Sequence, residues 1–299
     1  MATVQAGARI LLKNILYLTD FSEPSEAALP FGMAIARSYG AKIYVLHVSV
    51  PPPYAYATPE TAAAALESQE ENAETEMQRV ESQLVNLPHE TAVERGTRVW
   101  PALERTIKDC QIDLVVLGTH GRTGAQKLLM GSVAEEIFRR SPVPVLTIGP
   151  SVRRGLHSDA RFHRVLFPTD FTPESVAAAP YGVSLAQENQ ANLVLLHVIP
   201  RSEEQTEAKP GELSVADAMY QLNEMVPVGA ELWCRPEPVV EYGEPAGRIL
   251  ETTKERGMDL IVLGVRQAVG RLSAATHLER STAHKVVAHA VCPVLTVRG

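Results

Sequence analysis

Residues 113–149 read DLVVLGTHGRTGAQKLLMGSVAEEIFRRSPVPVLTIG, and this stretch decides the fold. It opens with Leu114–Leu117, a short apolar run that is typical of a buried parallel strand. A glycine-rich loop follows, and residues 133–138 then place apolar side chains on one face of a helix. Ser132 stands where a helix N-cap is expected, and Glu135 completes the spacing of a capping box. The order strand, glycine loop, helix start predicts an anion-binding site, because the first N–H groups of a helix can point at a ligand.

The spacing of the glycines in this loop is more specific than their number. Gly118, Gly121 and the pair Gly131-Ser132 form the pattern G, two residues, G, nine residues, G-S. No Gly-Lys-Ser/Thr follows, so this is not a Walker A loop, and it is not the dinucleotide fingerprint GxGxxG either. The pattern resembles the G-2x-G-9x-G-S/T signature of the universal stress protein family, in its ATP-binding branch.

Length and composition limit the class of protein. The chain has 299 residues, is 45% hydrophobic, and carries a formal net charge of −7. The length predicts two domains of about 150 residues each. No apolar run approaches the roughly 20 residues that cross a bilayer, and the N-terminus lacks the apolar core of a signal peptide. Three scattered cysteines indicate a reduced protein without a disulfide framework. We therefore expect a cytoplasmic protein that is not a general nucleic-acid binder.

The sequence repeats itself. Residues 15–22 (ILYLTDFS) return 150 positions later as residues 165–172 (VLFPTDFT), while DLVVLG recurs as DLIVLG and PVLT recurs unchanged. Such a register indicates two tandem copies of one domain. We place copy one at residues 1–152 and copy two at residues 153–299, with a polar and basic linker at about residues 151–161.

Each copy alternates short apolar runs with longer helical patterns, which predicts βαβ units and a parallel sheet. The family resemblance implies an α/β fold with two tandem Rossmann-like doubly wound domains. Each would hold a five-stranded parallel sheet in the order 3-2-1-4-5, with helices on both faces. Ligands of such sheets bind where the strand order reverses, here between strands one and four. In copy one we expect strands near residues 13–18, 42–48, 90–94, 113–118 and 143–148, and helices after Ser22 and near residues 59–84, 101–110 and 132–140.

The resemblance also implies which residues bind a nucleotide. Family members use the aspartate that ends strand one against the nucleoside and the backbone at the end of strand two against adenine, which correspond to Asp20 and Val48. From the residues alone, a structural role for Asp20, in an Asx-turn or as a helix cap, is as well supported as a contact with the nucleoside. A solvated loop position for His120 is likewise as well supported as a contact with phosphate. Phosphate and ribose would be bound by Gly118, His120, Gly121, Gly131, Ser132 and Val133.

Copy two departs from this pattern. The second glycine of the loop is missing, and Arg280-Ser281 replaces the Gly-Ser pair. A side chain at these positions denies the close backbone approach that a phosphate needs. His47 and His197 recur in both copies although the loop does not, so we expect them to be features of the fold. These differences predict one nucleotide site, in copy one.

The resemblance suggests a universal stress protein that binds ATP, with or without Mg²⁺, and acts as a stress-response switch or interaction module with a protein partner. A slow ATPase on the same fold and a nucleotide-free scaffold are the alternatives, and we assign no catalytic residue and no metal ligand. Family members commonly dimerise through strand five. We therefore predict that the two copies form an internal pseudo-dimer, strand five against strand five, and leave further oligomerisation open.

Overall fold

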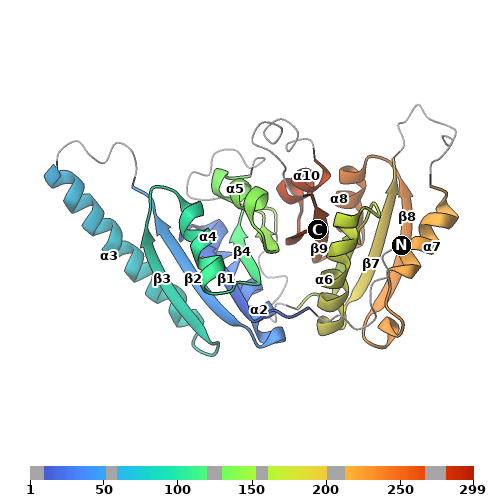
Figure 1. Cartoon of the computed structure of the whole chain (residues 1–299), viewed down its shortest axis with the longest axis horizontal. Coiled ribbons are helices and arrows are strands. Elements are labelled where there is room, and N and C mark those ends of the chain that lie inside the picture. Colours follow the sequence, from blue (N-terminus) through green and yellow to red (C-terminus); the bar gives the residue numbers. More distant parts are fainter. Residues whose placement is uncertain (1–9, 52–58, 120–129, 153–160, 201–212, 267–280) are drawn as a thin grey trace.

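The computed structural model describes residues 10–51, 59–119, 130–152, 161–200, 213–266 and 281–299, and all structural statements below refer to them. Within these ranges strands and helices alternate along both halves (Figure 1). The strands are β1 (Asn14–Thr19), β2 (Lys42–Ser49), β3 (His89–Arg95), β4 (Leu114–Gly118), β5 (Val145–Ile148), β6 (Arg164–Pro168), β7 (Asn192–Ile199), β8 (Arg235–Tyr242), β9 (Leu260–Val265) and β10 (Val294–Arg298). The helices are α1 (Glu23–Glu26), α2 (Leu29–Tyr39), α3 (Pro59–Gln83), α4 (Val99–Asp109), α5 (Ser132–Arg140), α6 (Pro173–Asn189), α7 (Val215–Glu224), α8 (Pro245–Glu255) and α10 (Thr282–His289), with a 3-10 turn η1 (Ala230–Leu232).

All ten strands belong to one sheet, in the order β3-β2-β1-β4-β5-β10-β9-β6-β7-β8. Neighbouring strands within each half are parallel. Each half therefore has the order 3-2-1-4-5 that the family resemblance implies, and the expected α/β class with doubly wound halves is confirmed. The two halves meet where β5 pairs antiparallel with β10.

The β5–β10 junction has local two-fold symmetry. Leu146 faces its counterpart Leu295 at the centre. On either side, the Thr147 hydroxyl donates to the carbonyl of Val294 at 3.1 Å, and the Thr296 hydroxyl donates to that of Val145 at 3.3 Å. The pseudo-dimer that the sequence predicts is therefore present within a single chain. It joins the two half-sheets into one continuous surface.

Two hydrophobic cores lie on the two faces of this sheet. Side chains alternate along each strand, so Ile15 and Tyr17 face one core while Leu16 and Leu18 face the other. Helices α2, α3, α6 and α7 cover the first core, and α4, α5, α8 and α10 cover the second. Both cores contain residues of both copies, so apolar packing supports the junction as well as the strand pairing.

The repeat extends to the side-chain hydrogen bonds that fix the sheet. Asp113 accepts the backbone N–H groups of Lys13 and Asn14 at 2.7 and 2.9 Å, which ties the start of β1 to the start of β4. Asp259 accepts those of His163 and Arg164 at 2.8 and 3.0 Å in the same way. The aspartate at the head of each DLxVLG motif is therefore a structural residue that sets the position of β1 and of β6.

The outer edge of copy two is protected against further strand pairing. Arg235 of β8 donates its N–H to the carbonyl of Ala191 next to β7. Successive residues of a strand direct their N–H groups to opposite sides, so residues 236 and 238 face away from the sheet. Both are prolines, which have no N–H to offer a neighbouring strand. The sheet therefore ends at β8.

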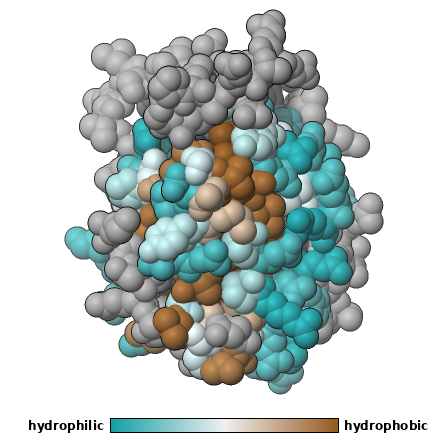
Figure 2. Space-filling model, turned by 90° about the vertical axis from the view of Figure 1, so that its right-hand side faces the viewer, coloured by the Kyte–Doolittle hydropathy of each residue, from teal (hydrophilic) through white to brown (hydrophobic). Residues whose placement is uncertain are grey.

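Apolar side chains gather at this same end of the molecule. Figure 2 shows them as a brown band between hydrophilic flanks. The exposed large apolar residues of α7, η1 and β8, with the turns beside them, are Val215, Tyr220, Val228, Leu232, Trp233 and Tyr242.

Within the described ranges, none of the helices combines the length and the apolar character that crossing a bilayer requires.

Candidate functional site

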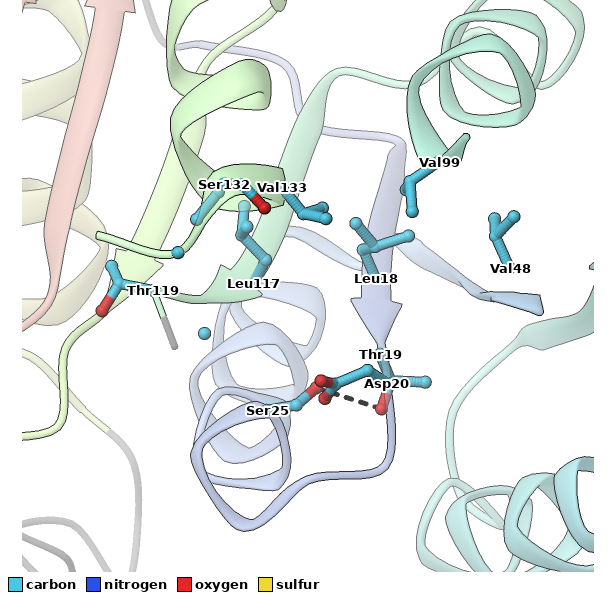
Figure 3. A pocket seen from close by; sticks show the side chains of 13 residues that line it. Leu18, Thr19, Asp20, Ser25, Val48, Val99, Leu117, Thr119, Ser132 and Val133 are labelled. Carbon is cyan, nitrogen blue, oxygen red and sulfur yellow. Dashed lines mark hydrogen bonds between the residues drawn. The ribbon is translucent and has the colours of Figure 1, made fainter. Parts of the chain in front are cut away.

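A pocket of about 310 Å³ opens at the carboxyl ends of β1 and β4, where the strand order reverses. Figure 3 shows Ser132 and Val133, at the start of α5, on one side of it and Thr19 and Asp20, at the end of β1, on the other. Apolar side chains from three further elements form its walls. Its lining consists of Leu18, Thr19, Asp20, Ser25, Val48, Val99, Leu117, Gly118, Thr119, Gly131, Ser132, Val133 and Ala134.

A second cavity of about 350 Å³ adjoins the first and shares Asp20, Val48, Val99 and Val133 with it. Three polar residues that the sequence had not indicated also line it: Gln69 of α3, Arg98 at the N-cap of α4 and Glu136 of α5. His47 and Val50 complete the lining. Each volume alone lies in the range of small-molecule sites, about 300–1,000 Å³.

Asp20 forms an Asx-turn, the structural role that the sequence left open beside a contact with the nucleoside. Its Oδ1 accepts the N–H of Ser22 at 3.0 Å and the Ser22 hydroxyl at 2.5 Å. Ser22 in turn is the N-cap of α1, where its hydroxyl accepts the N–H of Ser25. The same carboxylate lines both cavities. Asp20 therefore has a structural role in the turn and also faces the site.

Copy two builds the same turn. Asp170 accepts the N–H and the hydroxyl of Thr172 at 3.1 and 2.6 Å, and Thr172 caps α6. Burial alone would raise the pKa of Asp170, but the hydrogen bonds to its carboxylate, those from Thr172 foremost, together outweigh it and hold this pKa below its ordinary value. The aspartate turn is thus independent of the glycine loop, which copy two lacks.

A histidine braces this turn in each copy. The residue after the aspartate has a left-handed backbone, with φ of 58° at Phe21 and 60° at Phe171, a conformation that costs a non-glycine residue energy. His47 packs its ring against Phe21 at 4.4 Å, and its Nδ1 donates to the carbonyl of Thr19 at 2.9 Å. His197 makes the equivalent contacts with Phe171 and the carbonyl of Thr169. Both histidines therefore act as features of the fold, as their recurrence predicts.

Gly118 is required by packing. A Cβ at this position would lie 2.6 Å from the carbonyl oxygen of Pro24 and 2.9 Å from its carbonyl carbon, in the first turn of α1. Its counterpart Gly264 is equally confined, since a Cβ there would lie 2.3 Å from the carbonyl oxygen of Glu174. Copy two keeps this glycine although it has lost the rest of the loop pattern. The first glycine of the signature therefore serves helix–sheet contact, whatever it contributes to a ligand.

We expect Gly118→Ala to destabilise the protein by about 1–3 kcal/mol even without a ligand, because the added methyl group meets backbone atoms that must shift. Gly264→Ala should cost at least as much. Gly32→Ala in α2 is the matched control, because its Cβ would make an ordinary contact of 3.7 Å with Val116. Urea unfolding of the three variants measures the difference, and equal midpoints for Gly118→Ala and Gly32→Ala would contradict this role.

The start of α5 differs from the prediction. The N-cap is Gly131, not Ser132, and a glycine has no side chain that could cap the helix. The reason is that the carbonyl of Gly131 already accepts the first helical bond, from the N–H of Glu135 at 2.9 Å, so Ser132 is the first helical residue. The capping box expected for Ser132 and Glu135 is therefore wrong.

Helix α10 shows what an ordinary cap looks like at the equivalent position. There the hydroxyl of Ser281 accepts the N–H of His284 at 3.2 Å and satisfies one of the donors that every helix start leaves unpaired. Ser132 occupies the position of Ser281 in copy one but gives no such cap. In the described part of the chain, the first turn of α5 therefore lines the pocket without a side-chain cap from its N-cap residue.

The glycine loop is closed at its base. The N–H of Gly131 donates to the carbonyl of Thr119 at 2.8 Å, and the N–H of Thr119 donates to that of Ile148 at 2.9 Å. These bonds connect the end of β4 to the start of α5 and to β5. His120 and Gly121, which the sequence places in the site, lie outside the described residues.

The structure thus brings six of the eight predicted residues to one pocket: Asp20, Val48, Gly118, Gly131, Ser132 and Val133. Sequence reasoning missed the apolar walls of the pocket and an ion pair that lines the adjoining cavity. Arg98, at the start of α4, contacts Glu136 of α5 at 2.6 Å, and copy two reverses the charges with Glu244 and Lys285 at 3.1 Å. A comparison of the two copies for swapped charges could have found this pair, whereas the walls are ordinary apolar residues that give no signal.

Two doubly wound α/β halves, with a pocket at the reversal of strand order in copy one, define a tandem protein of the Rossmann-like type. Comparison with known proteins gives the family. The model of the universal stress protein family matches residues 12–149 and 161–298, and the chain belongs to this family.

Relatives and solved structures agree with this membership. The universal stress protein YxiE of Bacillus subtilis is 33% identical over 150 residues, which cover 46% of this chain and 99% of the relative. The universal stress protein MJ0577 of Methanocaldococcus jannaschii is 26% identical over 166 residues, covering 46% and 96%. A universal stress protein structure from Archaeoglobus fulgidus matches 95% of this chain and 98% of its own length, with a TM-score of 0.70 and 23% identity. The two first relatives thus match one copy's length, and the last shares the fold of the whole chain.

Proposed function

We propose that copy one binds ATP or a related adenine nucleotide in the pocket between β1, β4 and α5, and that this binding makes the protein a stress-response switch or interaction module. Family membership and the complete glycine spacing support the proposal. The observation that carries it is the uncapped start of α5 at the pocket wall, set against the capped start of α10 in copy two. Among the described residues, a side chain satisfies one of these donors in copy two, whereas none does so from the N-cap position of α5, where we propose that a phosphate accepts them.

The pocket offers each part of a nucleotide a suitable environment. Backbone donors of α5 and of the glycine loop suit the phosphates, because the positive end of the helix dipole favours anions. Leu18, Val99, Leu117 and Val133 give an apolar surface for a base. Asp20 lies where a ribose hydroxyl or an adenine amine could donate to its carboxylate. In the described part of the chain no cluster of three or more His, Cys, Asp or Glu side chains could hold a metal ion. Where Mg²⁺ takes part, we propose that it binds together with the phosphates.

We expect Asp20→Ala to weaken nucleotide binding by at least about tenfold, the equivalent of one lost hydrogen bond to a charged acceptor, while Asp170→Ala leaves binding unchanged. The pair is well matched, because each substitution removes the same two hydrogen bonds in the same turn. Their effects on stability should therefore be similar. Equal losses of affinity from both would mean that copy two also binds.

Tryptophan fluorescence can report this binding directly. Trp100 is 4% exposed, follows the pocket residue Val99, and has the guanidinium of Arg140 above its ring at 4.5 Å. The second tryptophan, Trp233, is 54% exposed at the far end of copy two. A Trp233→Phe variant leaves Trp100 as the sole reporter, and ATP should change its emission in a saturable way. Calorimetry with ATP, ADP, AMP and cyclic AMP then identifies the preferred nucleotide.

Two further measurements separate this proposal from its alternatives. Mass spectrometry of nucleotides released on denaturing the purified protein distinguishes a binder from a nucleotide-free scaffold. A multiple-turnover phosphate-release assay distinguishes a binder from a slow ATPase. We expect bound adenine nucleotide and less than one turnover on the time scale of binding. Purified protein that neither retains nor takes up nucleotide would refute the proposal.

A further inference from the structure

Arg298 reaches from copy two into copy one. It lies at the end of β10, and its guanidinium donates to two carbonyls at the C-terminal end of α5, those of Ser141, at 2.8 Å from Nε, and Phe138. Its Nη1 donates to the carbonyl of Arg266, at 3.0 Å, where β9 of copy two has just ended. Burial lowers the pKa of Arg298 from its ordinary value, as expected for a cation partly withdrawn from water. One side chain thus contacts copy one at two carbonyls and its own copy at a third.

This link has no counterpart in copy one. The register that sets Leu146 opposite Leu295 makes Gly149 the equivalent of Arg298. A Cβ on Gly149 would lie 3.7 Å from the carbonyl oxygen of Ala290 and 3.9 Å from that of Val287, at the C-terminal end of α10. The two positions therefore face equivalent helix ends across the junction, but only copy two supplies a cation. The C-terminal carbonyls of α5 gain a charged partner, which the dipole of a helix favours at that end.

The opposite end of α5 forms the pocket. Gly131, Ser132 and Val133 line it, and the helix ends at Arg140. The nine residues of the helix span about 13 Å. Because an α-helix of two to three turns moves as a rigid rod, a tilt at its C-terminal end displaces the N–H groups at its start. A contact that fixes the C-terminal end of α5 therefore also fixes the position of the N–H donors at its N-terminal end.

We propose that Arg298 of copy two is a positioning residue for the site in copy one, because it anchors the C-terminal end of the helix whose N-terminal end binds the nucleotide. The inference rests on the proposed function and assigns a role to the copy whose own loop has degenerated. Copy two contributes the anchor, and copy one contributes the pocket. Nucleotide binding in turn should stabilise the contact between the copies, since coupling between two sites is reciprocal.

The competing explanation is a direct electrostatic attraction between the Arg298 guanidinium and the bound phosphates. The distance between them distinguishes this explanation from the anchoring of α5. The guanidinium lies about one helix length from the phosphates, which exceeds the screening length of about 8 Å at physiological salt. A direct attraction would therefore weaken in about 0.5 M salt. An anchoring effect on α5 would persist there.

The test compares two arginines of copy two that both contact helix C-termini. Arg298→Ala removes the anchor of α5, whereas Arg164→Ala removes an equivalent contact, from Arg164 to the carbonyl of Arg256 at 3.0 Å, at the end of α8. ATP affinity is measured on the full chain well below the unfolding temperature, at low salt and at about 0.5 M salt. We expect Arg298→Ala to bind roughly three- to tenfold more weakly at both salt concentrations and Arg164→Ala to bind like the parent. Arg298→Lys should be intermediate, because an ammonium keeps the charge but not the fork of donors.

Hydrogen exchange of α5 without nucleotide gives a readout that does not depend on the proposed function. Faster exchange in α5 for Arg298→Ala, but not for Arg164→Ala, supports the anchor even if the parent fails to bind ATP. Failure of the parent to bind would refute the proposed function alone. If the parent binds and Arg298→Ala binds equally well, or if both arginine variants lose affinity to the same extent, the anchoring role is overturned.

Discussion

Gly131→Arg should abolish nucleotide binding and leave the fold intact. Gly131 lines the pocket and precedes the first turn of α5. Its backbone has φ of −61° and ψ of 148°, which any L-residue adopts without strain, so the substitution costs little in the free protein. The arginine side chain would instead occupy the space where backbone and phosphate must approach closely. We expect affinity to fall by at least about a hundredfold, or roughly 2.7 kcal/mol.

Copy two carries an arginine, Arg280, at the position equivalent to Gly131. Titration of the Trp233→Phe background with ATP measures the loss, and circular dichroism confirms the fold. Gly131→Ala, with a single added methyl group, serves as the graded control and should lose less affinity. If Gly131→Arg bound ATP as tightly as the parent, the phosphates would have to be bound elsewhere.

The second large effect is expected at the junction. Leu295 is 2% exposed and faces Leu146 at the centre of the β5–β10 pairing. Leu295→Asp places a carboxylate there without a partner, and an uncompensated buried charge costs about 3–5 kcal/mol. A loss of that size is a large part of the stability of a typical domain, about 5–15 kcal/mol. We therefore expect the two copies to separate or copy two to unfold.

Leu232→Asp is the matched control, because it makes the same change in copy two at a side chain that is 77% exposed. Denaturant unfolding gives the loss of stability, and hydrogen exchange at residues 145–148 reports on the strand pairing. The control should unfold like the parent. Parent-like protection of β5 in Leu295→Asp would show that the pairing with β10 contributes little.

The repeat made most of the fold predictable. Two copies with the same motifs in the same order imply two equal half-sheets, and a strand at the edge of each predicts how they join. The predicted ends of helices were less accurate than the predicted strands where a turn interrupts or ends the helix. The expected single helix after Ser22 is divided into α1 and α2 in copy one, and Pro30 at the start of α2 does not by itself explain the division, because copy two has a proline at the equivalent position. The same segment of copy two is one helix, α6, which tolerates Pro180 in its interior.

The site was predictable only where a motif marks it. The glycine spacing identified Gly131 and its neighbours, and the aspartate motif identified Asp20. Contacts that depend on three-dimensional placement left no pattern in the sequence. Arg298 reads as an ordinary charged residue near the end of the chain, and its role emerges only because β10 carries it to the end of α5. The capping box failed for a related reason, since the helix begins one residue earlier than the serine suggests.

The antiparallel joint between β5 and β10 also determines how such a molecule can change over generations. When a two-fold interface joins two identical chains, every mutation enters both halves at once, and a change that ruins one site ruins its twin. Here each half has its own stretch of coding sequence, and the joint keeps the halves together in a fixed ratio of one to one. Arg280 and Arg298 could therefore become established in one half while Gly131 and Gly149 persisted in the other. Because the two halves of a duplicated chain can change independently, each can take on a function that the other lacks.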